Sequence, residues 1–164
     1  MVDLDNIQEH MRTQAIDAWL VYDFRGGNPV MWQLLGDKRR TTRRAFLLIL
    51  AAGRPRLLCH AIEMDVFADL DVDLAPYRSW SEMCSLLQTA LQDCVQVAMD
   101  YSPGAELPTM SWVDGGTLEL VRSLGVQVVS AAALFQVGLT TWSAQALESH
   151  RSACRHVVEV KDAA

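Results

Sequence analysis

Two apolar runs meet across one short turn in AFLLILAAGRPRLLCH, the stretch from Ala45 to His60. The runs AFLLILA and RLLCH have the composition of buried strands, and the four residues between them, Ala52 to Pro55, have that of a turn. Strands joined by so short a connection pair antiparallel. We therefore expect a β-hairpin here, and a parallel strand elsewhere would make the sheet mixed.

An amphipathic helix and a strand precede this hairpin. One face of the helix carries the apolar residues Leu4, Ile7, Met11 and Ala15. The apolar run AWLVY, residues 18–22, follows directly. The sequence therefore predicts a helix that feeds a buried strand.

Two further helix and strand units follow the hairpin. Ser79 and Glu82 have the spacing of a capping box before a helix that leads into the strand VQVAM, which ends at Met99. Asp114 can cap a second helix, and Gly125 is a natural stop for it before the strand VQVV. The fold class that we expect is α/β, with a mixed central β-sheet flanked by helices on both faces.

The composition indicates one soluble globular domain. The chain has 164 residues, of which 51% are hydrophobic and 21% are charged, and its formal net charge is −6. Affinity for nucleic acid comes mostly from clustered Lys and Arg, so an acidic chain is a poor general binder. We expect small molecules or proteins as partners, and no nucleic acid.

The sequence predicts a cytoplasmic protein without a membrane span. Its start, MVDLDNIQEHM, carries acids where a secretory signal carries cations, and no apolar run approaches the ~20 residues that cross a bilayer. The cysteines lack the close pairs of zinc sites and redox dithiols. We expect buried, reduced thiols at Cys59, Cys84, Cys94 and Cys154.

No familiar catalytic motif stands out. The loop DFRGGNP, residues 23–29, lacks the Lys and hydroxyl of a phosphate-binding loop, and its proline has no N–H to give. No GxSxG pentapeptide offers a nucleophilic serine. His10 and His60 are isolated, and His150 and His156 lie six residues apart, on different helix faces. We therefore predict no catalytic residue and no metal ligand in this chain.

Three acids follow predicted strands, which leaves one metal hypothesis open. Asp23, Glu63 and Asp100 each come shortly after a strand, and acids at strand ends can converge on Mg²⁺. The same positions also suit acids that cap turns and helices. A Mg²⁺-dependent phosphoesterase or nuclease is the least favoured alternative.

A run of cations is the strongest local signal. Five of the 14 Lys and Arg residues fall within seven positions, at Lys38, Arg39, Arg40, Arg43 and Arg44. Some of these will lie on a solvated face. Arg43 and Arg44 abut the predicted strand, where a guanidinium can be held in place to clamp a carboxylate. This pattern makes a free-standing binding module for small anions a second alternative.

Several segments, taken in order, resemble the N-terminal domain of the Xaa-Pro aminopeptidase, prolidase and creatinase family. They are DAWLVYDFRGGNP, WQLLGDKRRTTRRAFLLIL, GRPRLLCHAIE and VAMDYSPGAELPTMSWVDGGTLELVRSLGVQVVS. The resemblance extends from about Ala15 to Ala164. It implies the creatinase/prolidase N-terminal fold with its ribonuclease H-like motif.

The resemblance implies a hydrolase of two domains. Residues 1–142 would be the N-terminal domain, and 143–164 a closing helix, with an apolar stripe, that leads to a C-terminal metallopeptidase domain absent from this chain. That domain would have the pita-bread fold and two divalent ions, Mn²⁺, Co²⁺ or Zn²⁺. It would cleave the bond between an N-terminal residue and proline, so this chain would be inactive alone.

The resemblance also implies a role in dimer assembly and substrate gating. The partners would be the chain's own catalytic domain and a second subunit of a homodimer, with proline-containing peptides as substrates. Arg43 best matches the Arg that holds the substrate carboxylate in creatinase-like members, and Arg44 is the next match. Arg25, Asn28 and Trp32 would lie near the partner's active site. Trp32 stands where the family often has Tyr, so this position keeps an aromatic ring but lacks the hydroxyl.

Overall fold

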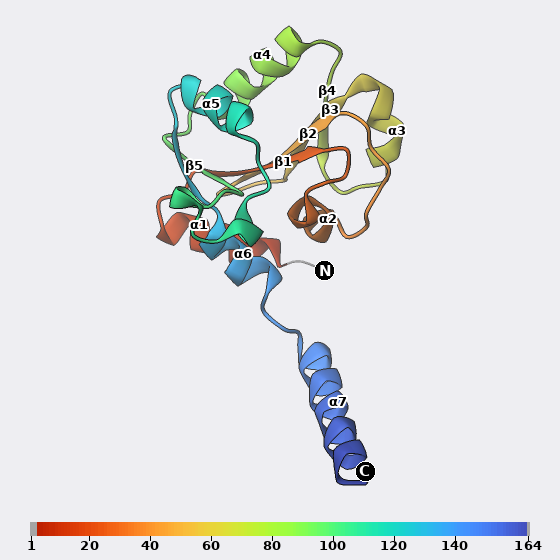
Figure 1. Cartoon of the computed structure of the whole chain (residues 1–164). Coiled ribbons are helices and arrows are strands. Elements are labelled where there is room, and N and C mark those ends of the chain that lie inside the picture. The colour runs from red at the N-terminus through yellow and green to blue at the C-terminus, as the bar shows by residue number, and fades with distance from the viewer. Residues whose placement is uncertain (1–2, 164) are drawn as a thin grey trace.

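The protein, described by a computed structural model over residues 3–163, is built on one mixed sheet of six strands (Figure 1). The strands lie in the order β4-β3-β2-β1-β5-β6. Their bounds are β1 Ala18–Phe24, β2 Arg44–Leu50, β3 Arg56–His60, β4 Asp73–Tyr77, β5 Gln96–Met99 and β6 Gln127–Ser130. Because β2 pairs antiparallel with both neighbours and the other pairings are parallel, β2 alone runs opposite to the remaining strands.

The hairpin that the sequence predicted is present. β2 pairs antiparallel with β3, with Ala45 opposite Cys59 and Leu48 opposite Arg56. β2 is also antiparallel to β1, whereas β1 is parallel to β5. The mixed α/β sheet is therefore confirmed.

Helices cover both faces of the sheet, as predicted. One face packs against α1 (Leu4–Thr13), α2 (Pro29–Leu35), α3 (Met64–Phe67) and α6 (Ala132–Leu139), and the other against α4 (Trp80–Leu91) and α5 (Gly115–Ser123). Alternate residues of β1 serve the two cores, since successive strand side chains point to opposite faces. Trp19 and Val21 pack on the α1 side, and Leu20 and Tyr22 on the α4 side.

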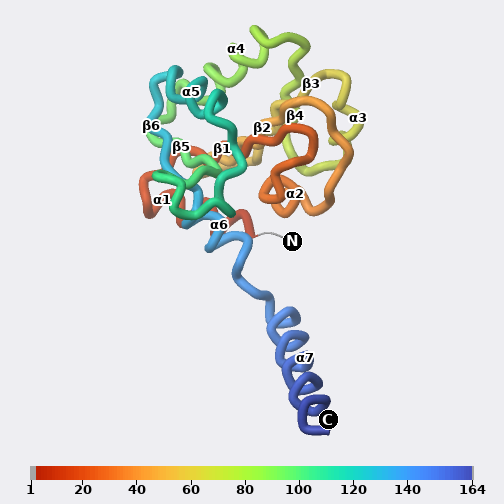
Figure 2. Tube along the Cα trace, viewed as in Figure 1, coloured from red at the N-terminus to blue at the C-terminus, as the bar shows by residue number. Residues whose placement is uncertain are grey.

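The last helix, α7 (Ala144–Ala163), projects from this body (Figures 1 and 2). None of its described residues is buried. Within residues 3–163, no helix combines the length and the apolar character that crossing a bilayer requires.

Local capping rules explain the helix bounds that the sequence predicted. The Ser79 side chain accepts from the Glu82 N–H at 3.1 Å, and Asp114 accepts from the Thr117 N–H at 2.9 Å. Gly125 follows α5 with a φ of 90°, a conformation that glycine adopts without strain.

Other expectations were wrong or incomplete. The first helix ends at Thr13, so Ala15, with a φ of 55°, does not continue its apolar face. The edge strand β4 and helices α2, α3 and α6 were not predicted from the sequence. Cys59 is a buried free thiol, as expected, but Cys154 is exposed.

A close approach of α6 to α1 supplies a stability test. A Cβ added at Gly138 would lie 2.5 Å from Cδ1 and 2.6 Å from Cγ1 of Ile7, a fully buried side chain that would have to shift within the packed core. We expect Gly138→Ala to lower the free energy of unfolding by about 1–3 kcal/mol, measured by urea denaturation.

The matched control is Gly115→Ala at the start of α5, where an added Cβ meets nothing within 4 Å. This variant should lose no stability and can gain up to ~1 kcal/mol from helix propensity. An equal effect of the two substitutions would contradict the tight α1–α6 packing.

Candidate functional site

The direction of the strands brings the candidate residues to one edge of the sheet. The carboxyl ends of β1, β3, β4, β5 and β6 meet there with the amino end of β2. Open α/β sheets bind ligands in the loops beyond the carboxyl ends of their strands. The loop 23–28 and the cations before β2 therefore share the edge where a site is expected.

Asp23 builds the turn that follows β1. Its carboxylate accepts hydrogen bonds from the N–H groups of Gly26 and Asn28, both at 2.8 Å, and the Gly27 N–H donates to the Phe24 carbonyl at 3.2 Å. Arg25 and Gly26 have φ values of 61° and 70°. A left-handed conformation at a residue with a side chain is strained, and it persists where surrounding contacts enforce it. This turn thus holds Arg25 at a fixed place.

Asn28 lies inside this loop rather than on its surface. It is 2% exposed, and its side-chain amide donates to the Tyr22 carbonyl at 2.7 Å and to Asp100 at 2.9 Å. Its side-chain oxygen accepts from the Val30 N–H at 2.9 Å and so caps α2. Asn28 can shape the loop, but it offers no free group to a ligand.

Asp100 is the buried acid of the site. It is 1% exposed and accepts from Asn28 Nδ2 and from Trp19 Nε1, each at 2.9 Å. Burial raises the pKa of its carboxyl to about 6, and the hydrogen bonds from Asn28 and Trp19 oppose that shift. Asp100 therefore ties the end of β5 to β1 and its loop.

Trp32 lies on the buried side of α2. Its side chain is 5% exposed and belongs to the core on the α1 side of the sheet. Its indole N–H has no hydrogen-bond partner among the described residues. A hollow of about 320 Å³ lies beside it, lined also by Gly26, Gly27 and Lys38. The buried Trp32 side chain thus packs against the loop 23–28 and helps to hold its conformation.

The cations before β2 have different environments. Arg39 pairs with Asp69 and donates to the Val66 carbonyl, and this pairing lowers the pKa of Asp69. Arg43 is exposed, and its one hydrogen bond to the described residues joins Nη1 to the Thr42 hydroxyl at 3.2 Å. Arg39 thus has a structural partner, whereas Arg43 keeps most of its donors free.

Arg44 is held by aromatic rings. Its guanidinium lies 5.5 Å from the centre of the Phe24 ring and 5.4 Å from that of Trp80. Cation–π contacts of this kind orient a guanidinium without neutralising it. The Arg44 carbonyl also accepts from the Tyr77 hydroxyl at 2.6 Å, which joins β2 to the end of β4.

These side chains surround a hollow of about 210 Å³. Its lining includes Phe24, Arg43, Arg44, His60, Arg78 and Trp80. No ion pair within residues 3–163 involves the three arginines of this hollow. The hollow therefore combines uncompensated positive charge with aromatic walls, which suits an anion attached to an apolar group.

Phe24 also borders a second hollow, on the other side of β1. This hollow measures about 370 Å³, and Trp112 and Asp114 help to line it. Phe24 and Trp112 are 45% and 40% exposed. Four residues of these hollows were not predicted from the sequence, because their grouping depends on strand order: Phe24, Arg78, Trp80 and Trp112.

The magnesium hypothesis is wrong for the part of the chain that is described. Asp23 accepts from backbone N–H groups, Glu63 accepts from the N–H and hydroxyl of Thr42, and Asp100 accepts from Trp19 and Asn28. No set of three metal-binding side chains gathers within residues 3–163. The acids stabilise turns and strand ends, which was the other expectation.

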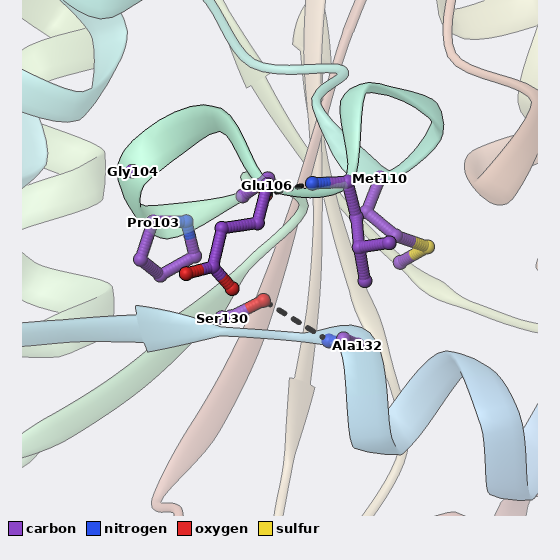
Figure 3. Close-up of a pocket in the computed structure, with 8 residues that line it drawn as sticks. Pro103, Gly104, Glu106, Met110, Ser130 and Ala132 are labelled. Carbon is purple, nitrogen blue, oxygen red and sulfur yellow. Dashed lines mark hydrogen bonds between the residues drawn. The ribbon is translucent and has the colours of Figure 1, made fainter.

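A further hollow beyond β5 and β6 contains a carboxylate. It measures about 310 Å³, and Figure 3 shows Glu106 directed across it towards Ser130. The Ser130 hydroxyl donates to the Tyr101 carbonyl at 2.8 Å, and the Ser102 hydroxyl accepts from the Leu107 N–H at 2.8 Å. Both serines hold turns together, so neither is placed as an activated nucleophile.

Comparison with known proteins identifies the fold. No protein-family model and no curated protein matches the sequence. Among solved structures, the prolidase from Pyrococcus horikoshii OT3 matches with a TM-score of 0.61 and 15% identity, over 81% of this chain and 33% of that one. The dipeptidase PepE from Mycobacterium ulcerans matches with a TM-score of 0.66 and 16% identity, over 88% and 38%.

An isolated domain matches over nearly its whole length. The creatinase/prolidase N-terminal domain of an X-Pro dipeptidase from Streptococcus pyogenes has a TM-score of 0.61 and 14% identity, over 81% of this chain and 95% of that one. The chain thus spans about a third of the prolidase from P. horikoshii and matches the N-terminal domain. The protein has the creatinase/prolidase N-terminal fold, as its sequence predicted.

The buried carboxyl of Asp100 gives a prediction for the pH dependence of stability. Its pKa is raised from 3.8 to about 6 in the folded state, so the folded protein binds this proton more tightly than the unfolded chain does. The contribution of Asp100 to the free energy of unfolding is therefore largest at low pH. It falls by about 1.4 kcal/mol per pH unit as the pH rises from about 4 to about 6.

Urea unfolding between pH 4 and pH 7 should show this slope as the difference between the wild-type protein and Asp100→Asn. A carboxyl-carbon NMR titration of Asp100 in the wild-type protein measures the same equilibrium without a substitution. Identical pH slopes for the two proteins, with a titration midpoint near 4, would contradict the prediction.

Proposed function

We propose that this protein is the N-terminal accessory domain of an Xaa-Pro peptidase, which serves substrate gating and dimer assembly. Its fold and the names of the matched structures, a prolidase and dipeptidases, support this proposal. Hydrolysis would take place in a separate catalytic domain that carries two divalent metal ions. Residues 143–164 would lead towards that domain, and the assembled enzyme would work in the cytoplasm.

The observation that carries the gating role is the cationic hollow at the strand edge. Arg43, Arg44 and Arg78 line it without an ion pair among the described residues, beside the rings of Phe24 and Trp80. A short peptide ending in proline presents a carboxylate next to an apolar ring. Arginine binds carboxylates through two parallel hydrogen bonds, so Arg43 would hold the carboxylate and the rings would contact the proline.

The loop 23–28 would limit the size of the substrates that can bind beside the hollow. Arg25 is held at the tip of the turn, with its guanidinium 5.8 Å from the centre of the Phe24 ring. Asn28 and Trp32 would act indirectly, because both are buried beneath the loop. Arg25, Arg43 and Arg44 would therefore be the members of the proposed gate that reach a substrate.

Exposed apolar side chains at the same edge support the assembly role. Phe24, Ile62, Trp80 and Trp112 are 45%, 73%, 58% and 40% exposed. Large apolar groups that gather on a surface are typical of protein interfaces. A second subunit that covers this edge would place its active site beside the cationic hollow.

The proposal predicts that the 164-residue chain does not hydrolyse Xaa-Pro dipeptides by itself, because no set of three metal-binding side chains gathers within residues 3–163. The assay is proline release from Ala-Pro with added Mn²⁺, Co²⁺ or Zn²⁺. Turnover that copurifies with the chain and changes with substitutions in it would reject the accessory role.

The gating role is tested in an enzyme that joins this domain to its catalytic domain, recovered by reading the coding sequence past codon 164. We expect Arg43→Ala to raise KM for Ala-Pro by about 10- to 100-fold, the effect of losing a hydrogen bond to a charged group of roughly 1.5–3 kcal/mol. Arg40→Ala is the matched control, since Arg40 is exposed in the same run and lines none of the hollows described above. Equal effects of both substitutions would contradict a specific role for Arg43.

The same hollow supports a second candidate, a free-standing binding module for small anions. This candidate requires the chain alone to bind an anion in the absence of any other domain. Calorimetry with acetate and inorganic phosphate distinguishes the two functions. Binding that Arg43→Ala abolishes and Arg40→Ala preserves would favour the module, and no heat above that of dilution would favour the accessory domain.

A further inference from the structure

Helix α7 carries a seam of side chains that the proposed function does not use. Leu147, His150, Cys154 and Val157 follow one another at intervals of three, four and three residues. This is the spacing at which side chains form the contact seam between two paired helices. The seam therefore offers one face of α7 to another helix.

The helix has little else to stabilise it. It is 20 residues long, and none of its described residues is buried. Helices of this kind are marginal in water without tertiary packing, since nucleation is costly and the apolar face supplies most of their stability in proteins. Leu147 and Val157 are 37% and 68% exposed. A second helix on the seam would cover both.

A pair of metal-ligand side chains stands in the middle of this seam. The sulfur of Cys154 lies 3.5 Å from Nε2 of His150, one helical turn away. The Trp142 ring packs edge-on against the imidazole, with 4.5 Å between ring centres, and orients it. His150 and Cys154 are four residues apart, a spacing that places both side chains on one face of the helix.

The distance between these two atoms fits zinc. Bond lengths of about 2.3 Å to sulfur and about 2.05 Å to nitrogen, at a tetrahedral angle, separate the two ligand atoms by about 3.6 Å. The sulfur and nitrogen atoms of the pair are thus already separated by the distance that a shared zinc ion requires, and the backbone need not move. Soft thiolate and imidazole ligands favour Zn²⁺ over Mg²⁺ or Ca²⁺.

The pair supplies two of the four ligands that a structural zinc site needs. Structural zinc takes four ligands, and no set of three metal-binding side chains gathers within residues 3–163. A second α7 laid antiparallel on the seam, with a two-fold axis between His150 and Cys154, would bring the same two side chains to the ion. Leu147 of each helix would then face Val157 of the other, so the contact would be self-complementary.

We propose that His150 and Cys154 of two copies of this chain bind one Zn²⁺ and pair their α7 helices. Each thiol loses its proton to solvent on coordination, and two thiolates balance the charge of the ion. Arg155 is adjacent, but it is already paired with Glu148 at 3.1 Å. This site is separate from the proposed gating hollow, because none of its residues lines that hollow.

The test is a titration of the metal-free 164-residue chain with Co²⁺ and then Zn²⁺, in a phosphine reductant that prevents disulfides. We expect tetrahedral d–d bands and a thiolate charge-transfer band that saturate at half an equivalent of Co²⁺, and that Zn²⁺ bleaches. Sedimentation should show the molar mass doubling relative to the metal-free state and returning after EDTA. Cys154→Ser and His150→Ala should each weaken Co²⁺ binding at least tenfold.

His156→Ala is the matched control, because His156 lies two residues from Cys154 on another face of the helix. Cys84→Ser controls for the half-buried thiols elsewhere. Both variants should bind like the wild-type chain. Far-UV circular dichroism checks that every variant is folded, as expected for the α7 substitutions, since none of the described residues of that helix is buried, and for the small change from thiol to hydroxyl at the half-buried Cys84.

Three results would overturn the proposal. The first is a Co²⁺ spectrum that survives Cys154→Ser. The second is one ion per chain with no change of mass. The third is a dimer that EDTA leaves intact and the reductant dissolves, which would show a Cys154 disulfide instead of a metal site.

Discussion

The buried carboxylate of Asp100 joins β5 to β1, and the geometry of the candidate site depends on how that carboxylate is held. Trp19 and Asn28 donate one hydrogen bond to each of its oxygens. A buried acid without such partners would cost several kcal/mol or shift out of its charged form. Because Asn28 also binds the Tyr22 carbonyl and caps α2, one amide fixes the strand end, the loop and the helix together.

The direction of β2 has an equally large effect on the surface. This strand runs opposite to its neighbours, so its amino end, with Arg43 and Arg44, lies beside the carboxyl ends of β1 and β3. Two arginines from one segment thereby meet Phe24 and Trp80 from two others. The aromatic rings hold Arg44 in place without removing its charge, which leaves the edge able to attract an anion.

Local signals in the sequence were sufficient for the hairpin, the mixed sheet and the caps at Ser79, Asp114 and Gly125, because each depends on a few neighbouring residues. Strand β4 was missed since Pro76 argues against a strand, and an edge position is where a sheet accepts proline. Asn28 and Pro29 were assigned to a loop, although a capping Asn and a first-turn proline also begin helices. The grouping of His60, Arg78 and Trp80 could not be predicted, because it needs the order of β3 and β4 in the sheet.

The residues of the strand edge divide into those that fix the geometry and those that can meet a ligand. Asp23, Asn28 and Trp32 are buried, and the hydrogen bonds of the two polar residues are used within the domain. Arg25 and Arg43 are exposed, and they keep charge that no carboxylate of the described chain neutralises. Such an edge offers positive charge and hydrogen-bond donors to a ligand from its exposed arginines, while its buried polar groups are already paired. Substitutions at the buried positions should therefore change the conformation of the loop, whereas those at the exposed arginines should remove a positive charge and leave the loop in place.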